Sequence, residues 1–126
     1  MDALFIEETK GTPRVTLSLE GEMHIEGRSL PEDPVQFYLP VLEWVRKSTV
    51  ENVTIYVRLD YMNTSSSKEL YLFFKYIKQN IHVKTVIVNW YYEEGDDDVY
   101  EIGREFEAIV DLPFYYHTYA EAFDEN

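Results

Sequence analysis

The sequence predicts an α/β fold, a single domain over residues 1–126 whose mixed β-sheet has an N-terminal hairpin and about three packed helices. Two observations predict it. The chain opens with short alternating segments separated by turns, and segments of helical periodicity then alternate with segments of strand periodicity. Hairpin strands pair antiparallel, whereas strands joined by a helix are usually parallel, so the sheet should be mixed. A chain of this length can bury a core without metals or disulfides.

The N-terminal segments have the pattern of short strands. Residues 3–7 form the first candidate, and a turn at residues 11–13 leads into residues 14–20, where apolar and polar side chains alternate. Residues 23–26 follow as the second arm of a hairpin. We expect Gly27 and Pro31 to end this arm, because glycine and proline commonly interrupt a strand.

The first helix should begin at Asp33 and Pro34, with Asp33 as the cap and Pro34 at the first helical position, where its missing N–H costs nothing. It should run to about Lys47. Its apolar residues form two stripes, Val35, Tyr38, Leu42 and Val45 on one and Phe37, Val41 and Trp44 on the other. Pro40 interrupts both stripes and removes a hydrogen bond, so the segment should kink or split, and we favour one bent helix.

The centre of the chain joins a strand to a second helix. Apolar residues alternate in the strand segment and recur at helical spacing in the next: Val53, Ile55, Val57 and Leu59, then Leu70, Phe73, Phe74 and Ile77. The second helix should end near Gln79. Between the two lies a run of small hydroxyl residues, at residues 60–68.

The C-terminal third continues the alternation. Residues 85–92 read as a strand buried on both faces at its start. Asp96 can cap a third helix, and acidic residues in a first turn suit the helix dipole. The apolar residues of this helix keep helical spacing: Val99, Ile102, Phe106, Ile109 and Val110. Leu112 and Pro113 should stop it, before a final strand at residues 114–119 and an acidic tail.

Composition narrows the function classes. A net charge of −13, from 24 acidic and 11 basic residues, would repel nucleic acid and anionic membranes unless a basic patch compensated. The densest basic group is Lys68, Lys75, Lys78 and Lys84. The chain has no cysteine, no basic leader and no apolar run long enough to span a membrane. We therefore expect a cytoplasmic protein that neither binds nucleic acid nor inserts into a membrane.

The sequence gives little support for a metal site or for a catalytic site. The three histidines, at positions 24, 82 and 117, lack the spacing of metal ligands, and residues 93–98 lack the pattern of a calcium loop. No histidine pairs with the hydroxyl run as a base. Lys68 is a candidate for that base, but a lysine beside a first-turn hydroxyl is commonly a solvated side chain. The run contains no glycine, which disfavours a nucleotide-binding loop. We expect no metal, no cofactor and no enzyme activity.

The hydroxyl run is the candidate site. Asn63 or Thr64 is a natural helix cap, because its side-chain oxygen can accept from first-turn N–H groups that have no other partner. Those N–H groups and the helix dipole favour an anion such as phosphate, either in a ligand or covalently on Thr64 or a neighbouring serine. The alternative is a plain cap with small residues for close packing.

Residues 60–68, with the sequence Asp-Tyr-Met-Asn-Thr-Ser-Ser-Ser-Lys, resemble the Tyr-aromatic/aliphatic-Asn-Thr-Ser-Ser-x-Lys signature of the SiaC family of bacterial regulatory phosphoproteins. Residues 29–33 resemble the family's Ser-Tyr-Pro-Glu-Asn segment, and residues 42–45 its Leu-Asp-Trp-aliphatic helix. Residues 90–93 and 111–114 are also similar to family segments, so the likeness covers nearly the whole chain in the right order. The hydroxyl motif is fairly specific; the other segments are supportive.

The resemblance implies a fold similar to STAS domains and a role in partner switching. In the family the threonine of Asn-Thr-Ser-Ser is phosphorylated by a cognate serine/threonine kinase and dephosphorylated by a PP2C-like phosphatase. The unphosphorylated protein binds and activates a diguanylate cyclase. That threonine is Thr64 here. The chain departs from the family pattern in Asp33, where asparagine is usual, and in Pro40, so a partner surface on the first helix could differ.

Thr64 is thus the expected phosphorylation site, and seven residues are expected to serve recognition by the kinase or the partner: Asp60, Asn63, Ser65, Ser66, Lys68, Leu72 and Tyr76. For Leu72 and Tyr76 a second packing contact is the competing interpretation. Two other functions stay open: a small enzyme that uses the corner as an anion site, and an unmodified scaffold, which a buried Thr64 would support.

Overall fold

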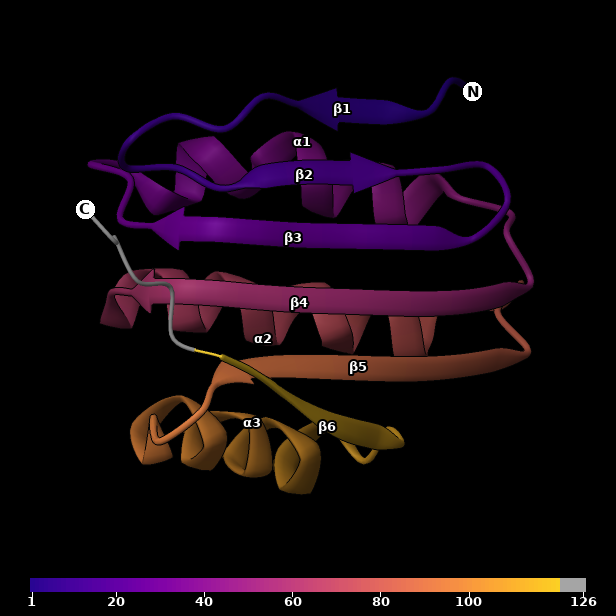
Figure 1. The fold of residues 1–126 in the computed structure, drawn as a ribbon. Helices are drawn as coiled ribbons and strands as arrows, with labels where there is room; N and C mark the ends of the chain where they lie inside the picture. Colours follow the sequence, from indigo (N-terminus) through magenta and orange to yellow (C-terminus); the bar gives the residue numbers. More distant parts are fainter. Residues whose placement is uncertain (121–126) are drawn as a thin grey trace.

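The computed structural model describes residues 1–120, which form one six-stranded sheet with helices packed against it (Figure 1). The elements are β1 (Leu4–Ile6), β2 (Arg14–Leu17), β3 (Glu22–Ser29), α1 (Pro34–Lys47), β4 (Asn52–Met62), α2 (Thr64–Gln79), β5 (Thr85–Glu93), α3 (Asp97–Val110) and β6 (Phe114–Tyr119). The expected acidic tail lies largely outside the described residues. Within them, none of the helices is long and apolar enough to cross a membrane.

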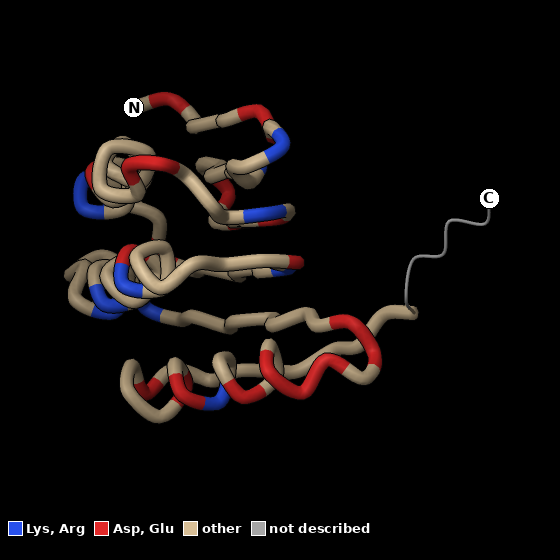
Figure 2. The backbone as a smooth tube through the Cα atoms, turned by 90° about the vertical axis from the view of Figure 1, so that its left-hand side faces the viewer, with Lys and Arg blue, Asp and Glu red and all other residues tan. Residues whose placement is uncertain are grey.

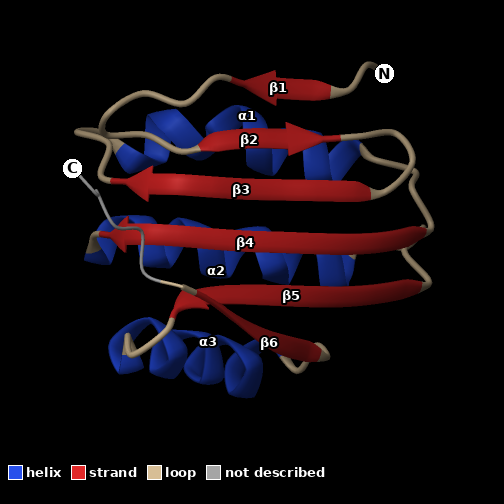
Figure 3. Cartoon of the chain, in the orientation of Figure 1, coloured by secondary structure: helices blue, strands red, loops and turns tan. Residues whose placement is uncertain are grey.

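The strands lie side by side in chain order, as Figure 3 shows. β1, β2 and β3 pair antiparallel, whereas β3 to β6 pair parallel, each step being connected by a helix. The predicted mixed sheet with an N-terminal hairpin is confirmed. Crossovers between parallel strands are almost always right-handed, so three successive steps in one direction place α1, α2 and α3 on the same face (Figure 2).

The core lies between this face and the helices. Its aromatic centre joins α2, α3 and the last two strands: the Phe74 ring lies 5.5 Å from Phe106 and 5.4 Å from Phe114, and Trp90 lies 5.7 Å from Phe106. Rings packed edge to face contribute beyond the area that they bury. This cluster therefore fixes α3 and β6 against the carboxyl-terminal half of the sheet.

Helix α1 has the predicted bounds. Asp33 Oδ1 accepts from Gln36 N at 3.1 Å, and Pro34 occupies the first turn. The helix remains a single element through Pro40, which is exposed, so the proline ring points to solvent. Most of both predicted stripes is buried, but Val35 is 63% exposed and lies outside the core.

Two expectations about burial and strand ends were wrong. β3 does not end at Gly27 but continues to Ser29, with a register shift after Gly27, because its last residues pair with the long strand β4. β5 is not buried on both faces at its start, since helices cover only one face, and Ile87 is 41% exposed. In α3 the predicted helical spacing is confirmed, and Ile109 is 63% exposed.

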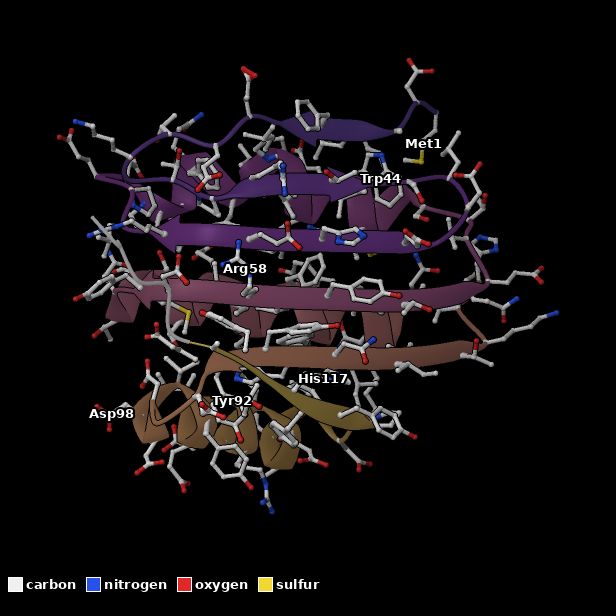
Figure 4. All side chains as sticks on the ribbon, in the orientation of Figure 1. Met1, Trp44, Arg58, Tyr92, Asp98 and His117 are labelled. Carbon is white, nitrogen blue, oxygen red and sulfur yellow. The ribbon has the colours of Figure 1, made fainter. Side chains whose placement is uncertain are left out.

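The other face of the sheet carries no helix and is covered by rings and polar groups (Figure 4). The His24 ring stacks on Tyr56 with centroids 4.5 Å apart, and the Tyr91 ring stacks on His117 at 4.7 Å. The Nε2 atom of His117 lies 2.8 Å from Asn89 Oδ1. Alternation along each strand thus places apolar residues under the helices and polar aromatic residues outside.

Candidate functional site

A single residue separates β4 from α2. Residues 60–62 belong to the strand, and Asn63 caps the helix that begins at Thr64. The Asn63 side-chain oxygen accepts from Ser66 N at 2.9 Å, and its carbonyl accepts from Ser67 N at 3.1 Å. The Ser67 bond is the first hydrogen bond of the helix itself. Of the four N–H groups that have no helical partner, the Asn63 side chain satisfies that of Ser66. Of the two cap candidates, the structure selects Asn63.

The end of β3 holds this corner in place. The Ser29 carbonyl accepts from Asn63 N and from Ser66 Oγ, both at 3.1 Å. Ser29 Oγ donates to Ser66 Oγ at 2.9 Å and lies 2.6 Å from Tyr38 Oη, which belongs to α1. Ser29 and Ser66 are both 0% exposed. The start of α2 is thereby bonded to its neighbouring strand and through that strand to α1.

This network changes the role of Ser66. Its hydroxyl is inside the protein and bonded to Ser29, so it positions the helix and is not accessible to a partner in this conformation. Ser29 and Tyr38 support the corner, and periodicity alone did not indicate them. The available signal was Ser29 in the segment resembling Ser-Tyr-Pro-Glu-Asn, whose position beside residues 63–66 only pairing of β3 with β4 reveals.

The same network predicts an alkaline loss of stability. Burial, opposed by the Ser29 hydrogen bond and reinforced by the charge of Glu69, raises the pKa of Tyr38 from its ordinary 10.0 to about 12. Below pH 10 the Tyr38 phenol is neutral in both the folded and the unfolded state, and its contribution to stability is fully present. Between pH 10 and 12 the unfolded chain ionises first, so Tyr38 alone should lower the free energy of unfolding by about 3 kcal/mol. The pKa values of Tyr116 and Tyr119 are also raised, so these two tyrosines should add to the fall. Urea unfolding across this range should show that fall.

Tyr38→Phe is the comparison that isolates this group. The variant should lose some stability at pH 8, because Ser29 Oγ loses a buried hydrogen-bond partner. Its further decline between pH 10 and 12 should be shallower than that of the wild type. Parallel curves for the two proteins would show that other tyrosines cause the alkaline loss.

The outer residues of the corner are accessible. Thr64, Ser65 and Lys68 are exposed, and within residues 1–120 no hydrogen bond occupies the Thr64 hydroxyl or the backbone N–H groups of Thr64 and Ser65. The helix N-terminus therefore presents unpaired donors beside a free hydroxyl. The condition that would support an unmodified scaffold, a buried Thr64, is not met.

The remaining predicted residues divide between two other places. Asp60 lies in β4, where its Oδ1 accepts from Tyr119 Oη at 2.9 Å and pairs with Arg58 at 3.5 Å. Leu72 and Tyr76 are half-buried, and the guanidinium of Arg46 in α1 lies 5.2 Å from the Tyr76 ring centroid. These contacts place Tyr76 on the α1 side of the helix, away from the hollow that contains Thr64.

Helical geometry explains that division. A spacing of four residues advances about 40° around a helix, so positions 64, 68, 72 and 76 drift steadily toward α1. Tyr71, seven residues after Thr64, returns to the same side and lines one hollow with Thr64 and Lys68. Sequence reasoning missed Tyr71; its spacing of seven from Thr64 was the available signal.

A second hollow of about 540 Å³ lies at the carboxyl ends of the central strands, next to this corner. Arg58 and four carboxylates from β4, β5 and the start of α3 line it. The carboxylates are those of Asp60, Glu93, Asp96 and Asp98. Within residues 1–120 no group of histidine, aspartate and glutamate side chains is arranged to hold a metal ion. The hollow therefore contributes negative potential beside Thr64 without forming an evident metal site.

Comparison with known proteins decides the family. Residues 6–119 match the sequence profile of the SiaC family regulatory phosphoprotein. The chain belongs to the SiaC family. An uncharacterized protein of Pseudomonas aeruginosa strain UCBPP-PA14 is 26% identical over 119 residues, which are 90% of this chain and 94% of that protein.

Solved SiaC structures have the same fold. SiaC of P. aeruginosa superposes with a TM-score of 0.81 at 25% identity, covering 94% of this chain and 100% of that one. A chain of the complex between diguanylate cyclase SiaD and its activator SiaC, from the same species, gives a TM-score of 0.79 at 25% identity and covers 92% and 99%. A SiaC homologue thus activates a diguanylate cyclase, and the predicted SiaC family fold is confirmed.

Proposed function

We propose that this SiaC family protein is a phosphorylation switch whose unphosphorylated form binds and activates a diguanylate cyclase, with Thr64 as the phosphate acceptor. A cognate serine/threonine kinase adds the phosphate and a PP2C-like phosphatase removes it. The observation that carries the proposal is the exposed, unbonded Thr64 hydroxyl at the first position of α2. Family membership and the named activator role of SiaC support the effector class.

The fold can accept a phosphate at Thr64. Phosphorylation adds roughly −1.5 to −2 charge, and a helix N-terminus stabilises such a charge through its dipole and its unpaired N–H groups. Lys68 lies one turn further along α2 and is exposed, so its ammonium can pair with the phosphate. The buried Ser29 and Ser66 network is not disturbed, because it faces away from solvent. The protein should therefore stay folded when it is modified.

The phosphate should instead act on the binding of the partner. Thr64 lies at the surface near the carboxylate-lined hollow, so a phosphate adds to an already negative region. An acidic or apolar partner surface brought to this corner would then meet electrostatic repulsion or a desolvation cost of several kcal/mol. That is enough to switch binding without a change of fold.

Mass spectrometry tests the site directly. The purified protein is incubated with ATP and its cognate serine/threonine kinase, and the peptide containing residues 63–68 is sequenced. We expect a single phosphate on Thr64, loss of labelling in Thr64→Ala, and retained labelling in Ser65→Ala, the matched exposed hydroxyl next to it. Phosphate on a residue outside 64–67 would exclude this corner as the switch.

A further inference from the structure

Within residues 1–120 no helix packs on one face of the sheet, and we call this surface the open face (Figure 4). The strand register aligns one side chain from each strand in a central row across it. The row consists of Phe5, Thr16, His24, Tyr56, Asn89 and Tyr115. Its two ends are exposed, Phe5 by 61% and Tyr115 by 55%. The middle of the open face therefore has rings and no carboxylate, lysine or arginine, which is the composition of an interface core.

The charges of the open face balance one another in the two rows beside the central row. Those rows contain Arg14, Glu26, Arg58, Tyr91 and His117 on one side and Glu22, Thr54 and Ile87 on the other. Two arginines stand against two glutamates, so with neutral histidines the formal charges of the three rows cancel, whereas the whole chain carries −13. A second copy of this acidic chain is thus repelled by most of the surface but not by the open face.

We propose that two copies of this chain associate through their open faces, with the two-fold axis parallel to the strands and between β3 and β4. The inference does not rest on the proposed function. Two sheets packed face to face lie about 10 Å apart, so their side chains meet. In this arrangement β3 of one copy faces β4 of the other, and likewise β2 faces β5 and β1 faces β6. The helices of both copies lie away from the contact, on the other side of each sheet (Figure 2).

The charges select this axis. It places Glu26 of each copy opposite Arg58 of the other, because the two residues are neighbours in register on β3 and β4. An axis across the strands, along the central row, would instead bring Glu26 opposite Glu22 of the second copy. Like charges in a desolvated contact are costly, whereas opposite charges fix the register of an interface. The chosen axis also sets Phe5 of each copy opposite Tyr115 of the other, at both ends of the row.

The size of the open face predicts how tightly the two copies bind. Six strands about 4.8 Å apart span about 24 Å, and the eight residues of β3 span about 26 Å. The contact therefore covers roughly 600 Å² on each copy, or about 1,200 Å² in total, which is the lower limit for a specific interface. We expect a reversible dimer with a Kd on the order of 10 µM.

Exchange of one charge pair tests the axis. In a homodimer, Glu26→Arg places two arginines opposite each other and Arg58→Glu places two glutamates there, so each variant alone should dimerise at least about tenfold more weakly than the wild type. In an equimolar mixture of the two variants, every such contact of the heterodimer regains one arginine and one glutamate, and the dimer should return to near the wild-type level. That rescue would also show that both variants are folded.

Sedimentation velocity measures the fraction of dimer for the wild type, the two variants and their mixture between about 1 and 500 µM. A wild type that stays monomeric throughout this range would overturn the proposal. A mixture no more dimeric than its two components would overturn it as well, because the pairing of Glu26 with Arg58 defines the axis.

A second pair of variants separates the open face from the helical side. Tyr115→Asp adds a charge to the central row, and Val35→Asp adds the same charge in α1, where the side chain is 63% exposed. Tyr115→Asp should weaken dimerisation at least about tenfold, whereas Val35→Asp should leave it unchanged. Far-UV circular dichroism checks that both variants are folded. Wild-type dimerisation of Tyr115→Asp, or a loss confined to Val35→Asp, would place the contact elsewhere and overturn the proposal.

Discussion

Thr64→Glu should weaken binding of the cyclase by about thirtyfold, which corresponds to roughly 2 kcal/mol, whereas Thr64→Ala should bind like the wild type and resist the kinase. Glutamate at the first position of α2 suits the helix dipole, so the fold should be retained. The carboxylate would lie in the hollow that also contains Lys68 and would add negative charge next to the carboxylate-lined hollow. Affinity by calorimetry, and cyclase activation, measure the effect.

Ser65→Glu is the matched control for that experiment. Ser65 is exposed in the same helical turn, but it does not line the hollow that contains Thr64 and Lys68. The same charge is added about 100° around the helix, and affinity should fall much less. Glutamate carries less charge than phosphate, so phosphorylated wild type should bind more weakly than Thr64→Glu. Wild-type affinity in both Thr64→Glu and the phosphorylated protein would rule out the charge mechanism.

Gly103→Val should lower the free energy of unfolding by about 3 kcal/mol. A Cβ on Gly103 would lie 2.6 Å from Trp90 Nε1 and 2.7 Å from its Cδ1, so α3 would have to move away from β5. That movement would strain the bond that Trp90 Nε1 donates to the Val99 carbonyl at 3.0 Å. Trp90 is a large, rigid and buried side chain, so the site has little room to relax.

Urea unfolding followed by tryptophan fluorescence and by circular dichroism measures this loss. Ala108→Val is the control, because Ala108 is exposed in the same helix and valine there changes only helix propensity, by about 0.5 kcal/mol. A stability of Gly103→Val equal to or above that of the wild type would show that α3 does not pack on Trp90 as described.

Much of the element order could be predicted from local chemistry. Asp33 with Pro34, and the pattern of residues that follows, located α1 correctly at both ends, and periodicity placed the end of α2 at Gln79. Caps and amphipathic stripes depend on neighbours within a few residues, so the sequence displays them directly. Burial was less predictable. Ile87 was assigned to a buried position because its apolar side chain suggests the core, whether or not another element covers it.

The candidate site likewise contains residues that the local sequence could indicate and residues that only packing brings together. Asn63, Thr64, Ser65 and Lys68 are consecutive or one turn apart, so a single motif could indicate them together. Tyr71, Ile109 and Glu105 line the hollow that contains Thr64 only because α3 lies beside α2, and more than thirty positions separate Tyr71 from Glu105. Ser66 was predicted to serve recognition at the surface, but its side chain is buried and its hydroxyl donates to the Ser29 carbonyl.

The sequence by itself determined that this is an α/β protein with a helix starting at a hydroxyl-rich cap, and that its charge opposes nucleic acid. These properties follow from spacing, capping and composition, which act within short stretches of chain. Only the tertiary structure decided that Thr64 is exposed while Ser66 is buried against Ser29, and that Thr64 and Ile109 line one hollow. The physical reason is that exposure and grooves depend on which distant segments pack together, here β3 against β4 and α3 beside α2.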